Sequence, residues 1–97
     1  MITLLVAYDV DTTTRAGRRR LRRVAQTCLD YGQRVQYSVF ECQVGDVEQV
    51  VFRQRLLDEI DPATDRLRLY RLPAHTIETV EVYGTDPKID FGGPLIG

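Results

Sequence analysis

The sequence predicts an α+β fold in which two helices lie on one face of an antiparallel sheet. Its 97 residues are enough for a single small domain with a two-layer core. A content of 43% hydrophobic and 28% charged residues, with a formal net charge of −1, is typical of a globular chain. Strand-like and helix-like hydrophobic patterns follow one another along the chain, and their order indicates the fold.

The first predicted element is a strand over residues 1–10, because its β-branched and nearly continuous apolar side chains are typical of a central strand. This strand ends near Asp9. The threonines at 12–14 then offer N-caps for a helix over residues 16–31. Gly32 follows, and we expect it to end the helix in the left-handed conformation.

The segment of residues 34–44 is strand-like, but its apolar side chains change parity. First Val35, Tyr37 and Val39 alternate, and then Phe40, Cys42 and Val44 alternate on the other parity. Because side chains alternate strictly across a strand, this change requires a bulge or a tight turn. The segment is therefore predicted to be either one bulged strand or two short antiparallel strands.

The remaining pattern contains three elements and a tail. We predict a helix over residues 46–60, a strand over 65–72, a short extra strand over 80–83 and an irregular tail over 85–97. The order β-α-β-β-α-β plus an extra C-terminal strand indicates a ferredoxin-like sandwich, with one domain over residues 1–84. Its helices leave one face of the sheet bare, and we expect a homodimer to cover that face.

Several classes of protein are excluded by what the sequence lacks. No apolar stretch approaches the roughly 20 residues of a membrane span, and the N-terminus lacks the pattern of a signal peptide, so a cytoplasmic location is expected. Cys28 and Cys42 lie in apolar-periodic segments and are predicted to be buried free thiols. One histidine and two separated cysteines do not make a zinc site.

The basic residues are concentrated near the N-terminus. Six of the 12 arginines fall between Arg15 and Arg23, and no acidic residue occurs between Thr12 and Leu29. Pairing within the helix therefore leaves these guanidinium groups unneutralised, and their mutual repulsion favours a polyanionic partner over a merely solvated face. Arginine suits bidentate contacts to phosphate, so a nucleic-acid backbone is the expected partner.

Three segments carry a resemblance to a known family. They are LLVAYDV at residues 4–10, YGQRVQYSVFE at 31–41 and DRLRLYRL at 65–72. With the arginine-rich helix between the first two, the chain resembles the CRISPR-associated protein two family, the small subunit of the spacer-acquisition complex. This resemblance runs from residue 2 to about residue 83. It implies a ferredoxin-like homodimer that binds nucleic acid and lies between two dimers of the spacer integrase.

The resemblance also implies site residues and an activity. The residues that match the family are Asp9 near the dimer axis, Arg15, Arg18 and Arg19 of the helix, Arg34, and Ser38 with Phe40 as supporting residues; we add Arg22, on the same basic arc, as a nucleic-acid contact. Some members of the family are assigned metal-dependent endoribonuclease or deoxyribonuclease activity. The expected partners are a second copy, the integrase and duplex DNA, with single-stranded RNA as a further candidate.

The residues alone also single out Asp9. A carboxylate at the end of an apolar central strand lies at the rim of the sheet, where a rigid scaffold holds it. Mg²⁺ prefers oxygen ligands, so two Asp9 carboxylates facing across a two-fold axis would hold one ion and make Asp9 both metal ligand and catalytic residue. The alternative is that Asp9 only ends the strand or caps the helix. Asp11, two residues on and on the same face, would help Asp9, but a capping or solvated role is favoured for it.

Two aromatic residues and the function itself remain open at this point. Tyr37 and Phe40 would stack on a base, but aromatic residues in strands more often pack in the core, which favours a structural role for both. The predicted function is a CRISPR adaptation protein that binds duplex DNA, bridges the integrase and cleaves RNA or DNA with Mg²⁺. The alternative is a structural DNA-binding adaptor without nuclease activity, and the two hypotheses differ at Asp9.

Overall fold

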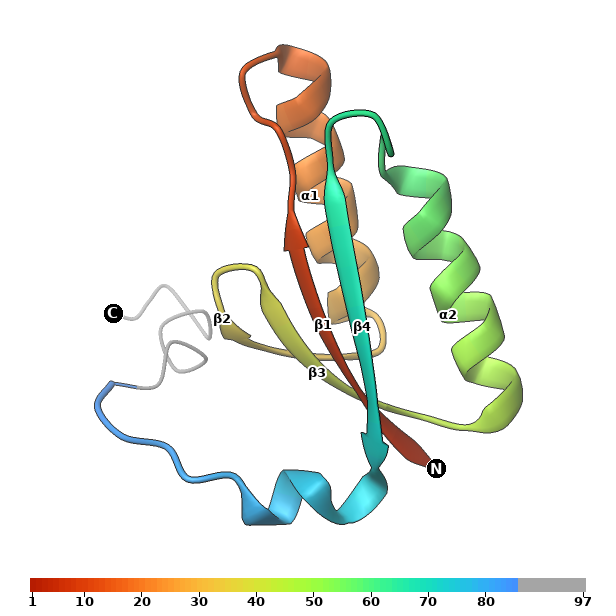
Figure 1. Cartoon of the computed structure of the whole chain (residues 1–97), viewed down its shortest axis with the longest axis vertical. Coiled ribbons are helices and arrows are strands. Elements are labelled where there is room, and N and C mark those ends of the chain that lie inside the picture. Colours follow the sequence, from red (N-terminus) through yellow and green to blue (C-terminus); the bar gives the residue numbers. More distant parts are fainter. Residues whose placement is uncertain (86–97) are drawn as a thin grey trace.

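The computed structural model describes residues 1–85 and contains one four-stranded antiparallel sheet with the strand order β2-β3-β1-β4 (Figure 1). The elements are β1 (Ile2–Asp9), α1 (Arg15–Leu29), β2 (Gly32–Gln36), β3 (Val39–Val44), α2 (Asp46–Glu59), β4 (Arg66–Pro73) and the 3-10 helix η1 (Ala74–Thr79). Both α-helices pack on one face of the sheet and against each other. The predicted ferredoxin-like α+β fold is confirmed.

The core lies between the sheet and the two helices. Alternate residues of the central strand β1, among them Leu4, Val6 and Tyr8, point toward the helices and are buried. The other strands and helices contribute Val24, Cys28, Phe40, Cys42, Val44, Phe52 and Leu56 to the same cluster. Cys28 and Cys42 are buried free thiols, as the sequence predicts.

Thr14 is the N-cap of helix α1, and its hydroxyl accepts a hydrogen bond from the Gly17 backbone at 3.0 Å. A Cβ on Gly17 would lie 1.9 Å from the Asp11 carbonyl oxygen, so glycine lets the preceding loop approach the helix closely. Gly32 does not adopt the expected left-handed conformation, and that prediction is wrong. Instead it starts β2, where a Cβ would lie 2.1 Å from the Glu41 carbonyl oxygen, so close strand approach is the reason for glycine there.

The parity change in residues 34–44 has two causes. Strands β2 and β3 form an antiparallel hairpin with its turn at Tyr37 and Ser38, and the register also shifts between Arg34 and Gln36. The prediction of two short antiparallel strands is confirmed and that of one bulged strand is wrong, although an irregularity in β2 also changes the parity before the turn reverses the chain.

Helix α2 and strand β4 lie close to their predicted positions. In α2, Phe52 and Leu56 are buried, whereas the equally apolar Val50 and Leu57 are exposed. Strand β4 packs two partly buried leucines against the core, Leu67 and Leu69. The side of α2 that contributes to the core is thus narrower than its hydrophobic content indicates.

The predicted extra strand over residues 80–83 is wrong for the single chain. After η1 the described chain runs away from the sheet, and residues 80–83 belong to no strand (Figure 1). A strand exists only through hydrogen bonds to a neighbour, and this route brings the segment to neither sheet edge. All but the first residue of the predicted 85–97 tail lie outside the described residues. No helix in residues 1–85 is long and apolar enough to span a membrane.

Candidate functional site

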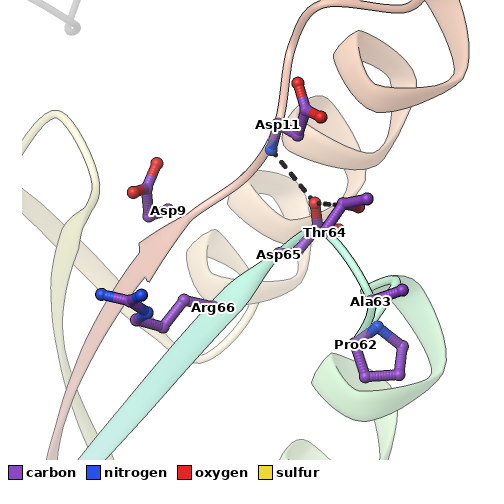
Figure 2. Close-up of a pocket in the computed structure, with 7 residues that line it drawn as sticks. All are labelled: Asp9, Asp11, Pro62, Ala63, Thr64, Asp65 and Arg66. Atoms are coloured by element: carbon purple, nitrogen blue, oxygen red, sulfur yellow. Dashed lines mark hydrogen bonds between the residues drawn. The ribbon is translucent and has the colours of Figure 1, made fainter.

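Asp9 lies at the rim of the sheet, on the face that carries no α-helix. It is the last residue of β1, is exposed, and stands opposite Arg66 in the antiparallel ladder with β4. Figure 2 shows both side chains beside an open pocket that Asp9, Asp11 and Arg66 line together with residues 62–65 of the loop before β4. This pocket measures about 540 Å³, several times the roughly 30 Å³ that one water occupies, so it has room for a hydrated ion.

Asp65 holds together the loops that form this rim, and its side chain is fully buried. Its carboxylate accepts hydrogen bonds from the backbone N–H groups of Asp11 (3.0 Å) and Asp61 (2.8 Å), from Arg20 Nε (2.8 Å) and from Thr64 Oγ1 (3.1 Å). Burial by itself raises the pKa of Asp65, but the hydrogen bonds outweigh it and hold the pKa well below its usual range. Asp65 thereby joins the β1–α1 loop, α1 and the loop before β4.

The Asp11 carboxylate makes hydrogen bonds within its own loop, in agreement with the role that the sequence favours. Its Oδ1 accepts hydrogen bonds from the Thr13 backbone at 2.9 Å and from the Thr13 hydroxyl at 2.7 Å, and these bonds lower the pKa of Asp11. Asp9 is therefore the rim carboxylate best placed to meet a ligand. No group of three potential metal-ligating side chains occurs within residues 1–85. A Mg²⁺ site fits these residues only if a second copy adds its own Asp9.

Four exposed arginines form one stripe along α1. They are Arg15, Arg18, Arg19 and Arg22, at the i, i+3, i+4 and i+7 spacing that places side chains on one helix face. The other two arginines of the helix have acidic partners, because Arg20 binds Asp65 and Arg23 lies 4.0 Å from Glu59. The stripe therefore consists of the four helix arginines for which we predicted nucleic-acid contacts.

Arg34 is placed apart from that stripe. It is half-buried on the helix-covered face, with its guanidinium carbon 5.1 Å from the centre of the Phe40 ring. Burial raises the pKa of Tyr8, and the nearby Arg34 guanidinium partly offsets this rise. Phe40 is fully buried, which supports the structural interpretation for that residue. Ser38 accepts a hydrogen bond from the Tyr8 backbone through its carbonyl oxygen (3.1 Å) and so fastens the hairpin turn beside the end of β1.

Tyr37 does not pack in the core, so the structural role that the sequence favoured for it is wrong. It lies on the hairpin turn and its side chain is 86% exposed. Strict alternation would place residue 37 on a strand face, whereas the turn removes it from both faces of the sheet. The change in parity between Val39 and Phe40 was the one signal in the sequence that indicated a turn in this segment.

The fold and the site define a small ferredoxin-like α+β domain with an open sheet face, a carboxylate at its rim and an arginine stripe on its first helix. The model of the family described as "CRISPR associated protein Cas2" matches residues 1–80, and the chain belongs to that family. The resemblance carried by residues 4–10, 31–41 and 65–72 is thus confirmed.

Individual relatives agree with this assignment. The chain is 53% identical over 93 residues to the "CRISPR-associated endoribonuclease Cas2" of Chlorobaculum tepidum, covering 96% of this chain and 97% of that protein. It is 48% identical over 93 residues to the "CRISPR-associated endoribonuclease Cas2 1" of Moorella thermoacetica, with the same two coverages. The crystal structure of Streptococcus pyogenes Cas2 at pH 6.5 superposes with a TM-score of 0.75 at 52% identity, covering 84% of this chain and 99% of that chain.

Proposed function

We propose that the protein acts in CRISPR adaptation as a homodimer that binds duplex DNA through α1 and bridges the spacer integrase. The observation that carries this proposal is the stripe of four exposed arginines on α1. Arg15 and Arg22 are separated by about 10 Å along the helix axis, at 1.5 Å per residue. A stripe of that length reaches several phosphates of one strand, and it favours binding to the backbone without preference for base sequence.

The open face of the sheet supports the proposal of a homodimer. In the centre of this face Leu5 of β1 stands opposite Tyr70 of β4, and the Tyr70 side chain is 43% exposed. The chain after η1 also exposes Val80 and Val82. A second copy related by a two-fold axis would cover the face and supply a strand partner for residues 80–83.

Mg²⁺-dependent cleavage of RNA or DNA is the catalytic part of the proposal. The two Asp9 carboxylates of the dimer would hold the ion, and the α1 arginines would hold the phosphate backbone beside it. When bound, Mg²⁺ would polarise the scissile phosphodiester and lower the pKa of a coordinated water. The names of the relatives from Chlorobaculum tepidum and Moorella thermoacetica, both called endoribonucleases, support this part.

A structural adaptor without nuclease activity is the second candidate function, and two observations favour it. Each chain supplies one exposed carboxylate at the rim, and Arg66 stands beside it in the ladder. A neighbouring guanidinium weakens the negative potential that a divalent cation requires. In this function Asp9 would not be needed, whereas the α1 arginines would be.

Replacing Asp9 with asparagine separates the two functions, because Asp9→Asn keeps the shape of the side chain and removes its charge. For the nuclease, we expect cleavage that requires Mg²⁺ and disappears in Asp9→Asn while duplex binding persists. Asp58→Asn, at an exposed position on α2, is the control and should cleave like the wild type.

Two results would change the assignment. Full Mg²⁺-dependent cleavage by Asp9→Asn would show that another group holds the metal. A wild-type protein that binds duplex DNA and the integrase but cleaves neither RNA nor DNA with any divalent ion would establish the adaptor.

A further inference from the structure

Tyr37 is the most exposed aromatic side chain among residues 1–85, and neither the proposed phosphate contacts nor the core uses it. Its side chain is 86% exposed, and no side-chain hydrogen bond or ring contact holds it within the described part of the chain. An exposed phenol ring offers two apolar faces to solvent and is a candidate for stacking on a flat partner.

The hairpin turn that carries Tyr37 is anchored to the centre of the sheet. The Tyr8 backbone N–H donates to the Ser38 carbonyl oxygen at 3.1 Å, and Val39 follows at once in the ladder opposite Ala7 of β1. The ring therefore projects from a backbone held on both sides, which lowers the entropy that is lost when a ligand stacks on it.

The surroundings of the turn are polar and basic. The neighbouring side chain on β2, Gln36, is exposed and polar. Along the same rim Arg66 stands opposite Asp9. Through the hydrogen bond from the Tyr8 backbone to Ser38, the turn lies beside the end of β1, where Asp9 faces Arg66. A solvent-exposed aromatic ring next to a polar side chain, with a guanidinium group at the adjoining end of the sheet, suits a nucleotide better than an apolar protein surface.

We propose that Tyr37 stacks on an unpaired base of a nucleic-acid strand whose phosphates are held at this rim by Arg66, the residue opposite Asp9. This inference rests on the proposed nucleic-acid function and adds a contact specific to single strands. Inside a duplex both faces of each base are covered by neighbouring bases, so a side chain stacks only where a strand is single or its end is splayed. Tyr37 thus distinguishes single-stranded segments and strand ends from continuous duplex.

The absence of tryptophan from the chain allows a direct test. Tyr37→Trp in the full-length protein introduces one indole at the turn, and we expect its fluorescence to be quenched when an unstructured oligothymidylate or oligouridylate binds. A continuous duplex should bind without this quenching. Val47→Trp is the matched control, because Val47 is 79% exposed on α2, far from the turn, and its indole should not respond.

Affinity measurements supply the second arm. Tyr37→Ala should weaken the binding of the single strand by at least about fivefold, the lower end of the effect of one base–aromatic stack. Tyr37→Phe should bind like the wild type, because stacking does not require the hydroxyl. Duplex affinity should be the same in all three proteins.

The outcomes separate the inference from the function on which it rests. If Tyr37→Ala binds single strands as the wild type does, or if the indole at position 37 responds to protein concentration and not to the oligonucleotide, the stacking role is wrong although the arginine contacts stand. If the wild type binds neither the single strand nor the duplex, the proposed function and the inference fail together.

Discussion

Asp65 shows how one buried residue organises the candidate site. Its carboxylate accepts hydrogen bonds from two backbone N–H groups, from Thr64 and from Arg20, although its side chain is not exposed to solvent. A buried carboxylate is stable in its charged form only with such partners. Because Arg20 binds Asp65, Arg20 does not belong to the solvent-facing arginine stripe of α1. The Asp65 carboxylate also holds the loop that follows Asp9 in place.

Substituting Asp65 tests this arrangement. Asp65→Asn removes the charge and replaces one acceptor oxygen with an amide group that faces existing donors, so we expect a loss of about 2 kcal/mol or more in the free energy of unfolding. Urea denaturation at neutral pH measures it. The exposed control Asp58→Asn should change the stability by less than about 0.5 kcal/mol, and an equal loss in both variants would contradict the role of Asp65.

The pH dependence of stability gives a second test of Asp65. Because the pKa of Asp65 is lowered in the folded protein, the stabilisation is complete above the pKa of the unfolded chain, about 3.9. It is lost as the pH falls from there through the folded pKa. The difference in unfolding free energy between wild type and Asp65→Asn should therefore be constant near neutral pH and shrink below about pH 4. A difference that grows on acidification would have the wrong sign.

The two thiols are predicted to be unreactive in the folded protein. Burial raises the pKa of Cys28 and of Cys42 to about 12, so both remain protonated thiols at neutral pH. A maleimide or iodoacetamide reagent should label neither residue in native buffer and both in denaturant, with mass spectrometry as the readout. Rapid labelling of the native protein would show that the core opens at α1 and β3.

At the scale of elements, helix α1 has three distinct sides. Val24 and Cys28 face the core, Arg20 and Arg23 face acidic partners, and the stripe of four arginines faces solvent. Amphipathic spacing predicts the first and third sides from the sequence. The second depends on where residues 59 and 65 lie, which helix periodicity does not reveal.

Removing part of the stripe should weaken DNA binding without affecting the fold. In the triple variant Arg15→Ala, Arg18→Ala and Arg19→Ala, all duplexes should bind more weakly regardless of sequence. The dependence of log affinity on log salt should flatten by roughly 0.9 for each phosphate that the variant no longer neutralises. Arg53→Ala on α2 is the control and should leave the slope as it is in the wild type. An unchanged slope in the triple variant would exclude α1 as the DNA-binding element.

At the scale of the whole molecule, two surfaces of the described single chain have no packing partner. The centre of the open sheet face is uncovered, and residues 80–83 run beside no strand of the described chain. Exposed apolar side chains at both places favour association with another surface. The proposed second copy would satisfy both and would bring a second Asp9 to the rim.

The oligomeric state follows as a prediction. Light scattering at tens of micromolar should give about 22 kDa, twice the chain mass of 11.1 kDa. Tyr70→Glu places a charge in the open face and should shift the protein toward the monomer, whereas Val47→Glu on α2 should not. A wild-type protein that stays at 11.1 kDa would contradict the dimer.

The sequence alone predicted the order of the four strands and the two α-helices, the α+β class, the burial of both cysteines and the exposed arginine stripe of α1. These features depend on the spacing of apolar and charged residues within one element, which the linear pattern records directly. The position of Asp9 at the rim was predictable for the same reason, because the apolar run of β1 ends there.

Tertiary structure alone decided which residues from distant elements meet. It paired Arg20 with Asp65, brought the loop around Asp11 against Gly17, turned the Tyr37 side chain out of the sheet, and left residues 80–83 without a partner strand. Each of these depends on contacts or hydrogen bonds between segments far apart in the chain, or on the exact residue at which the chain reverses. Hydrophobic periodicity describes the face that an element buries but not its neighbour across that face, so these features required the folded chain.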